Sequence, residues 1–160
     1  MNNSNIISYK NSLDKVKEDI AAGKMHHVLA KSNSMRPFIV RGRDELILQQ
    51  TDEHSFQKGA ILLAELGSVN HVLHRLVKIE GDNLVLRGDS NLNRDELCGR
   101  NDVIAEVVAV VRNGKLMKKG SPGWNFYRHF WPSSSLLRRM LLKLYASSDS
   151  NNNQSLQSAD

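Results

Sequence analysis

The chain has 160 residues, which is room for one domain and argues against a multi-domain protein. Apolar residues make up 40% of the chain and charged residues 24%, an ordinary balance for a globular protein. Lys and Arg outnumber Asp and Glu by 22 to 17, and the net charge of +5 permits attraction to anionic membrane surfaces, nucleic acid or acidic peptides.

The cysteine content and the hydropathy of the sequence indicate in which cellular compartment the protein is expected. The single cysteine, Cys98, cannot form an internal disulfide, so nothing requires an oxidising environment. The first twenty residues are polar and lack the apolar core of about 7–15 residues that a secretory signal needs. No stretch reaches the roughly 20 apolar residues that cross a bilayer. We therefore expect a cytoplasmic protein, or one held peripherally at the inner face of the cytoplasmic membrane.

Residues 1–24 are expected to form an N-terminal helical segment. Leu13, Val16 and Ile20 recur at helical spacing among charged residues over 12–22. Gly23 comes directly after this segment, at the position where glycine commonly ends a helix. The pattern predicts a short amphipathic helix that packs as a lid on a sheet.

Residues 25–119 change to short apolar runs separated by turn residues, which predicts strands. The expected strands are ELILQ, GAILLAEL, HVLHRLVKI, NLVLRG and DVIAEVVAVV. Turns are expected at GDN after Glu80 and at Asn113-Gly114, before KLM. This pattern predicts a mainly β, mostly antiparallel domain with short flanking helices.

Residues 120–146 form an aromatic and amphipathic C-terminal segment. Pro132 and the serines after it give a helix start signal. One face of the predicted helix is apolar and the other basic; the apolar face holds Leu136, Leu137, Met140, Leu141 and Leu144, and the basic face Arg138, Arg139 and Lys143. The helix either packs on its own domain or, with Trp124 and Trp131, contacts a membrane interface. Residues 147–160 are polar and predicted to be disordered.

The chemistry lies in a series of short motifs. KSNSMRPF, residues 31–38, places Ser32 and Ser34 two apart, and it is followed by LHRLVKI and RGDSNLNRDE. An isolated SxSM is common, but the order and context of these segments make the combination specific. A serine hydroxyl attacks a carbonyl at neutral pH only when a neighbouring base takes its proton.

At these residues the sequence resembles the type I signal peptidase family, within the superfamily that also contains the self-cleaving SOS-response repressors. The similarity spans roughly residues 31–111. It implies the β fold of that superfamily, with Ser34 as nucleophile in SxSMxP and with Met35 and Pro37 completing the motif. It also implies that the Ser32 hydroxyl and the Ser34 backbone N–H hold the oxyanion.

The His74-Arg75 pair stands where bacterial members carry lysine and arginine, whereas endoplasmic-reticulum-type and archaeal enzymes carry histidine there. The resemblance therefore implies His74 as the base and Arg75 as a supporting residue. RGDSN resembles the family's GDNN motif, which makes Gly88 and Asp89 the matching positions and Asp89 the acid. Ser90 and Phe38 depart from the family pattern. The whole arrangement is similar to small signal-peptidase-like proteins of Bacteroidetes-type bacteria that lack the usual anchor.

The residues themselves support this chemistry. A histidine titrates near ~6.5, so His74 can accept a proton at pH 7 without deep burial. Asp89 can orient the imidazole, as the third member of a triad does, and the donors of Ser32 and Ser34 can stabilise an oxyanion. Neither HExxH nor CxxC occurs, so we expect no metal and no cofactor.

Two alternatives share this fold. A repressor is disfavoured because only 33 residues precede Ser34, too few for a helix-turn-helix domain with a linker, so no nucleic-acid partner is expected. A catalytically inactive peptide-binding or regulatory module remains open. The favoured partner is an extended peptide or precursor protein, bound by addition to a sheet edge. The sequence leaves substrate identity and oligomeric state open.

Overall fold

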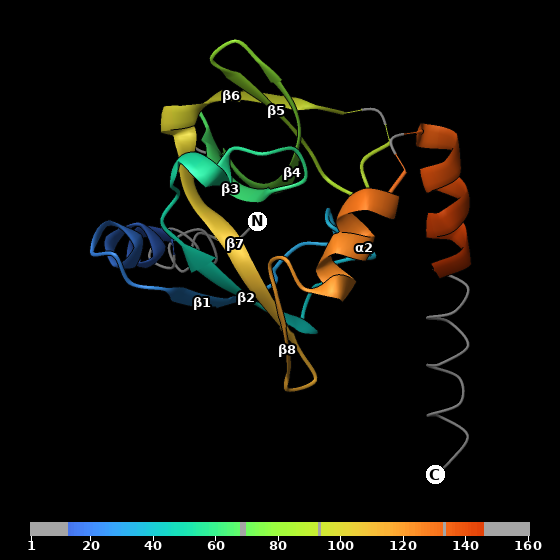
Figure 1. Ribbon diagram of the computed structural model, residues 1–160, viewed down its shortest axis with the longest axis horizontal. Coiled ribbons are helices and arrows are strands. Elements are labelled where there is room, and N and C mark those ends of the chain that lie inside the picture. Colours follow the sequence, from blue (N-terminus) through green and yellow to red (C-terminus); the bar gives the residue numbers. More distant parts are fainter. Residues whose placement is uncertain (1–12, 68–69, 93, 133, 146–160) are drawn as a thin grey trace, which may run out of the picture.

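The computed structural model describes residues 13–67, 70–92, 94–132 and 134–145. Within these residues the chain forms an eight-stranded antiparallel sheet with short helices, so the expected mainly β architecture is confirmed (Figure 1). The strands are β1 (His26–Leu29), β2 (Asp44–Gln49), β3 (Ile61–Leu66), β4 (Asn70–Glu80), β5 (Asn83–Arg87), β6 (Glu96–Gly99), β7 (Val103–Arg112) and β8 (Lys115–Lys118). Their order is β1-β2-β7-β3-β4-β5-β6, and β8 pairs with β7.

The expected strands and turns are present in the structure. β4 and β5 are joined by a tight turn with Gly81 at φ 61°, and β7 and β8 by Asn113 at φ 50° and Gly114 at φ 72°. In the β7–β8 turn both central residues have positive φ, which matches the right-handed twist of the strands that the turn joins. β1, β6 and β8 were not among the predicted strands, and each has only four residues. Short 3-10 turns at Glu53–Ser55 (η1) and Arg100–Asp102 (η2) precede β3 and β7.

The curled sheet buries two apolar clusters, and β3 contributes to both. Ile61 and Leu63 belong to the cluster that also holds the N-terminal helix and Phe38, whereas Leu62 and Ala64 belong to the cluster beneath β4, β5 and β6. Alternate strand residues point to opposite faces, so a continuously apolar strand is the one that separates two cores. This explains why β3 has no polar residue before Glu65.

The N-terminal helix is present over residues 13–21 and covers the sheet as expected. Val16 and Ile20 are buried in the first cluster, and Lys17 binds Glu65 of β3 at 2.7 Å. Gly23 follows the helix at φ 71°, and its N–H donates to the carbonyl of Ile20 at 2.9 Å. This left-handed ending is the one the sequence predicts, because glycine adopts positive φ without a steric penalty.

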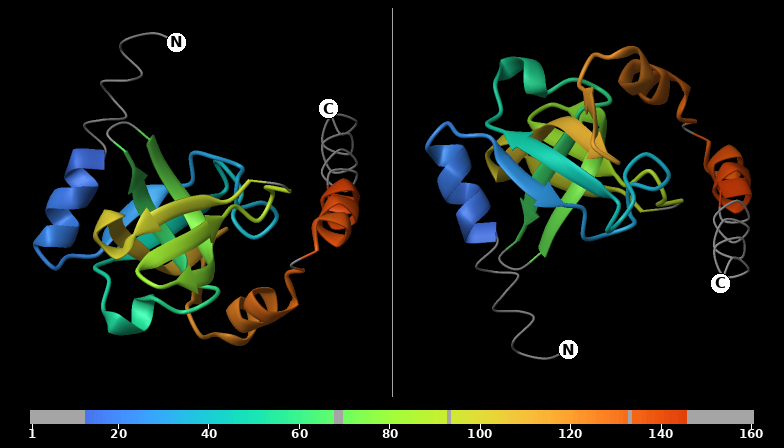
Figure 2. Two further views of the ribbon diagram at one scale, coloured as in Figure 1. Left: turned by 90° about the horizontal axis from the view of Figure 1, so that it is seen from above. Right: turned by 90° about the horizontal axis from the view of Figure 1, so that it is seen from below.

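The C-terminal helices lie at the opposite end of the sheet from the N-terminal helix (Figure 2). The first, α2 (Pro122–Phe130), packs Trp124 edge-on against Phe38 with ring centroids 5.2 Å apart. Trp124 is only 2% exposed, so it belongs to the core and not to a membrane-facing surface. No helix in the described part of the chain is long and apolar enough to cross a bilayer.

The second C-terminal helix spans residues 135–145, within the predicted segment, but its faces are arranged unexpectedly. Arg138 from the basic face is buried, and its guanidinium donates to the carbonyl of Asn91 at 2.6 Å. Much of the apolar face is exposed, namely Leu136, Leu137, Met140 and Leu144. The helix therefore contacts its own domain through an arginine. The predicted disordered tail, 147–160, lies outside the described residues.

Candidate active site

Ser34 lies in the loop between β1 and β2, and the segment after β5 fixes the position of this loop. The backbone N–H and the hydroxyl of Ser90 both donate to the carbonyl of Ser34 at 2.9 Å. The Ser90 hydroxyl also lies 3.1 Å from the carbonyl of Asn33. The next residue, Met35, is 1% exposed and anchors the loop in the first cluster. The nucleophile candidate is thus held from two sides.

Gly88 allows this close approach of the two segments. A Cβ at position 88 would lie 2.7 Å from the carbonyl oxygen of Ser34, closer than side-chain carbons approach backbone atoms. Only glycine therefore fits here without displacing the serine loop. The RGDSN segment serves Ser34 through its backbone and through Ser90, which stands where the resembled family has asparagine.

His74 is buried on β4 and contacts a carboxylate that the sequence analysis did not identify. Its Nδ1 lies 2.8 Å from Oε2 of Glu96, on β6, and the two side chains are 6% and 9% exposed. An ionised carboxylate only accepts hydrogen bonds, so Nδ1 carries the proton in this pair. The other ring nitrogen, Nε2, is then the one that can take a proton from a hydroxyl.

Asp89 occupies a different place from the one predicted. The expectation set it beside His74, whereas its carboxylate accepts hydrogen bonds from Nε and Nη2 of Arg75 at 2.8 and 2.6 Å. Arg75 also donates to the carbonyl of Gly59 at 3.0 Å. Neighbouring strand residues point to opposite faces, so Asp89 binds Arg75 on the face of β4 away from His74. Glu96 occupies the position expected for Asp89.

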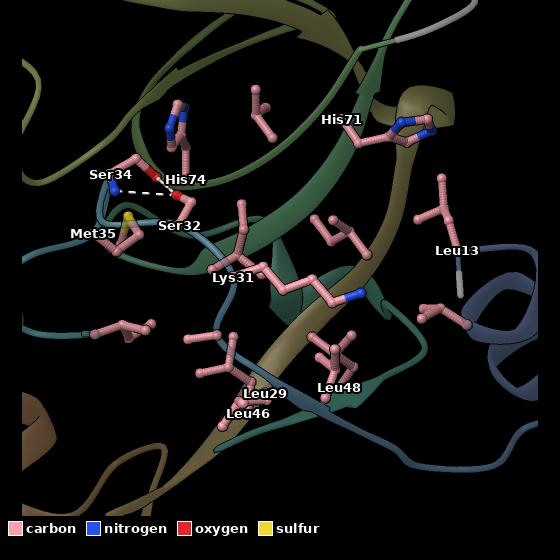
Figure 3. Close-up of a pocket in the computed structure, with 17 residues that line it drawn as sticks. Leu13, Leu29, Lys31, Ser32, Ser34, Met35, Leu46, Leu48, His71 and His74 are labelled. Carbon is pink, nitrogen blue, oxygen red and sulfur yellow. Dashed lines mark hydrogen bonds between the residues drawn. The ribbon is translucent and has the colours of Figure 1, made fainter. Parts of the chain in front are cut away.

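Ser34 and His74 line the same apolar pocket, which has a volume of about 270 Å³. Figure 3 shows the two side chains at one end of the pocket, with His71 and Leu13 towards the other. Apolar side chains supply most of the wall, including Val16 of the N-terminal helix and Leu46, Leu48 and Leu63 of the sheet. The structure therefore brings together the predicted serine and histidine in a cavity with the character of a ligand site.

The two serines contact each other directly. The Oγ atoms of Ser32 and Ser34 are 2.9 Å apart, and the backbone N–H of Ser34 donates to Ser32 Oγ at 3.1 Å (Figure 3). Both groups that are expected to hold an oxyanion therefore lie close to the Ser34 hydroxyl: the Ser32 hydroxyl contacts it, and the N–H belongs to Ser34 itself. A carbonyl oxygen in the pocket would have to replace Ser32 Oγ as the acceptor for this N–H.

Glu96 was missed because its strand inverts the usual hydrophobic pattern. In β6, Glu96 and Cys98 are buried while Leu97 is 64% exposed. The hydrophobic pattern of this strand would predict that Leu97 is buried and that Glu96 is exposed. The surrounding RDE run also reads as a solvated loop, so no sequence signal distinguishes Glu96 from its neighbours.

The chain was also compared with known proteins. No family model matches it, and no curated protein matches it. Among the described residues, no group of three or more His, Cys, Asp or Glu side chains is arranged to hold a metal ion.

Proposed function

We propose that this chain is a serine endopeptidase with a signal-peptidase-like β fold, which cleaves an extended peptide or precursor protein. The observation that carries the proposal is the placement of Ser34 and His74 in one pocket, with Glu96 bound to Nδ1 of the same imidazole. A hydroxyl, a base and a group that orients the base are the three parts that nucleophilic acyl transfer requires.

The reaction follows from these positions. As the Ser34 Oγ attacks the scissile carbonyl carbon, its proton passes to Nε2 of His74, and Glu96 stabilises the imidazolium that forms. The negative charge on the carbonyl oxygen is stabilised by the Ser34 N–H and the Ser32 hydroxyl. The imidazolium then gives its proton to the leaving amine, and water attacks the acyl-serine with His74 again as base. The products are two peptides, and the enzyme is regenerated.

The sheet supports binding of an extended substrate. Among the described strands β1 lies at the edge of the sheet, with β2 as its neighbour, and the chain passes from its end at Leu29 into the loop that carries Ser34. A peptide that adds to this edge places its backbone next to the serine, and its side chains alternate towards the apolar pocket. The apolar lining favours an apolar substrate residue beside the scissile bond, and the resemblance to signal peptidases implies a small one. We place the substrate in the cytoplasm or at the inner face of the cytoplasmic membrane.

The proposal is tested by peptide-library digestion followed by mass spectrometry. The full chain is expected to cleave a subset of peptides that share a small or apolar residue before the cut, and Ser34→Ala is expected to abolish cleavage. Cleavage that persists in Ser34→Ala would show that a contaminant is responsible. If wild type and Ser34→Ala bind peptides equally and neither cleaves them, the protein is a peptide-binding module.

A further inference from the structure

The N-terminal helix, residues 13–21, forms part of the pocket that holds Ser34 and His74. Leu13 and Val16 of this helix line the pocket, and Figure 3 shows Leu13 on the opposite side of the pocket from Ser34. The rest of the lining comes from β1, β2, β3, β4 and the loop that carries Ser34. The pocket therefore continues past the serine and reaches the helix.

The pocket has more space than a small side chain beside the scissile bond would fill. Its volume is about 270 Å³, whereas a cavity of about 150 Å³ already holds a benzene molecule. Apolar side chains form most of its wall, and an apolar group gains free energy when it leaves water for such a surface. The remaining space therefore favours a second, longer apolar side chain of a bound peptide.

The helix is attached to the sheet next to the pocket. Val16 is only 3% exposed and belongs to the first apolar cluster. Lys17 binds Glu65 of β3 at 2.7 Å, and Asp19 binds Nδ1 of His26 on β1 at 2.7 Å. Because two strands and the core hold the helix, its inner face is a fixed wall. A fixed wall discriminates between side chains by their length, whereas a flexible surface adapts to them.

We propose that Leu13 determines how long an apolar side chain the pocket accepts, so that the N-terminal helix sets part of the substrate preference. The inference rests on the proposed function, since the ligand is the same extended peptide that adds to β1. A substrate side chain that is too long collides with Leu13, and one that is too short leaves a void beside it and loses contacts. Leu13 lines the pocket and is half-buried, whereas Val16 is fully within the core.

Two variants of Leu13 change the pocket in opposite directions. Leu13→Ala removes most of the side chain and lengthens the pocket, and Leu13→Phe places a ring there and shortens it. Because Leu13 is half-buried, both variants are expected to fold, which circular dichroism verifies. The matched control is Leu116→Ala, because Leu116 is a 50% exposed leucine on β8, outside the lining of the pocket.

Peptide binding is measured in the full chain with Ser34→Ala as the parent of every variant, so that cleavage does not interfere. The probes are short fluorescein-labelled peptides of alanine and serine, in which one position at a time carries alanine, leucine, phenylalanine or tryptophan. Fluorescence anisotropy gives the Kd of each peptide. At the position that enters the pocket, we expect the ratio of the affinities for the tryptophan and leucine peptides to rise at least about tenfold in Leu13→Ala. The same ratio should fall at least about tenfold in Leu13→Phe and stay within about twofold of the parent in Leu116→Ala.

The inference is overturned if this ratio is the same in both Leu13 variants and in the parent, or if Leu116→Ala shifts it as far as Leu13→Ala does. It is also overturned if no peptide position shows a dependence on side-chain length. Cleavage is measured separately in chains that keep Ser34. Length selection without cleavage supports the inference and removes the proposed peptidase activity, whereas cleavage that does not respond to Leu13 removes the inference and leaves the activity.

Discussion

The contact between His74 and Glu96 shows how one side chain can determine which nitrogen of an imidazole is basic. A glutamate that accepts from Nδ1 fixes the tautomer in which Nε2 is basic, and in the proposed mechanism it stabilises the imidazolium formed during proton transfer. The serine and the histidine that line the pocket were named from short motifs in sequence order, whereas Arg75, named with them, binds Asp89 on the other face of β4. Glu96 was not, because it is a buried charge on a short strand whose leucine faces outward.

Glu96→Gln is expected to lower kcat for peptide cleavage by roughly a hundredfold to ten-thousandfold with little change in KM, because an amide stabilises an imidazolium poorly. Glu96→Asp should recover part of the rate. The control is Asp95→Asn, which changes the adjacent carboxylate that binds Arg87. Steady-state kinetics on a cleaved peptide measure both constants, and an unchanged kcat in Glu96→Gln would refute the role of this residue.

Burial makes the thiol of Cys98 unreactive towards alkylating reagents. Burial, with a smaller effect of Asp102, raises the pKa of its thiol to about 11, so almost none is thiolate at pH 8. We expect iodoacetamide at pH 8 to modify the native chain slowly and the urea-unfolded chain rapidly, as followed by mass spectrometry. Equal rates in the two states would mean that β6 does not hold the thiol in the core.

At the scale of elements, the site depends on two loops that must stay in register. The loop of residues 88–91 binds the carbonyl of Ser34, and Gly88 is the position where the two backbones come closest. The longer strands and the hairpin turns followed from alternation and from turn residues. β1, β6 and β8 did not, since four residues carry too little periodicity to distinguish a strand from a loop.

Gly88→Ala is expected to displace the Ser34 loop and to reduce cleavage at least about tenfold while the chain stays folded, since a misplaced nucleophile loses much of its advantage. Gly99→Ala is the matched control, because a Cβ there would meet only Asp102 Oδ2 at an ordinary 3.4 Å. Circular dichroism checks the fold, and kinetics check the rate. Full activity in Gly88→Ala would show that the loop contact does not position the serine.

At the scale of the whole molecule, Asp44 connects the sheet to the serine loop. It is fully buried and binds Arg43, Arg112 and the N–H of Val40. Burial opposes its ionisation, but the hydrogen bonds from Arg43 and Arg112 outweigh burial and lower the pKa of Asp44 from 3.8 to about 2. The unfolded chain therefore binds more protons than the native chain between these values, and stability falls as pH falls.

We expect this carboxylate to contribute about 2 kcal/mol to the free energy of unfolding above pH 5, and to lose that contribution as pH drops through 4 towards 2. Asp44→Asn should be less stable than wild type at pH 7, and the difference should shrink in acid. Urea unfolding at pH 7, 5, 4 and 3 measures it. A difference that stays constant with pH would mean that Asp44 is not the titrating group.

The C-terminal helix shows what a sequence pattern leaves undetermined at this scale. The helix itself followed from the spacing of its leucines, whereas the face that contacts the domain did not. A hydrogen bond from Arg138 to the carbonyl of Asn91 fixes the orientation, and this depends on a loop distant in sequence. Tertiary contacts of this kind decide which face of a short amphipathic helix is buried.

Covalent labelling of Ser34 tests whether this serine is a nucleophile that His74 activates. A fluorophosphonate probe is incubated with wild type, Ser34→Ala, His74→Ala and, as a control for histidine removal elsewhere, His54→Ala, and the modified residue is identified by mass spectrometry. We expect phosphonylation of Ser34 in wild type and in His54→Ala, and strongly reduced labelling in His74→Ala. Labelling of Ser34 at the same rate without His74, or no labelling of Ser34 in the folded wild-type chain, would contradict a serine nucleophile activated by that histidine.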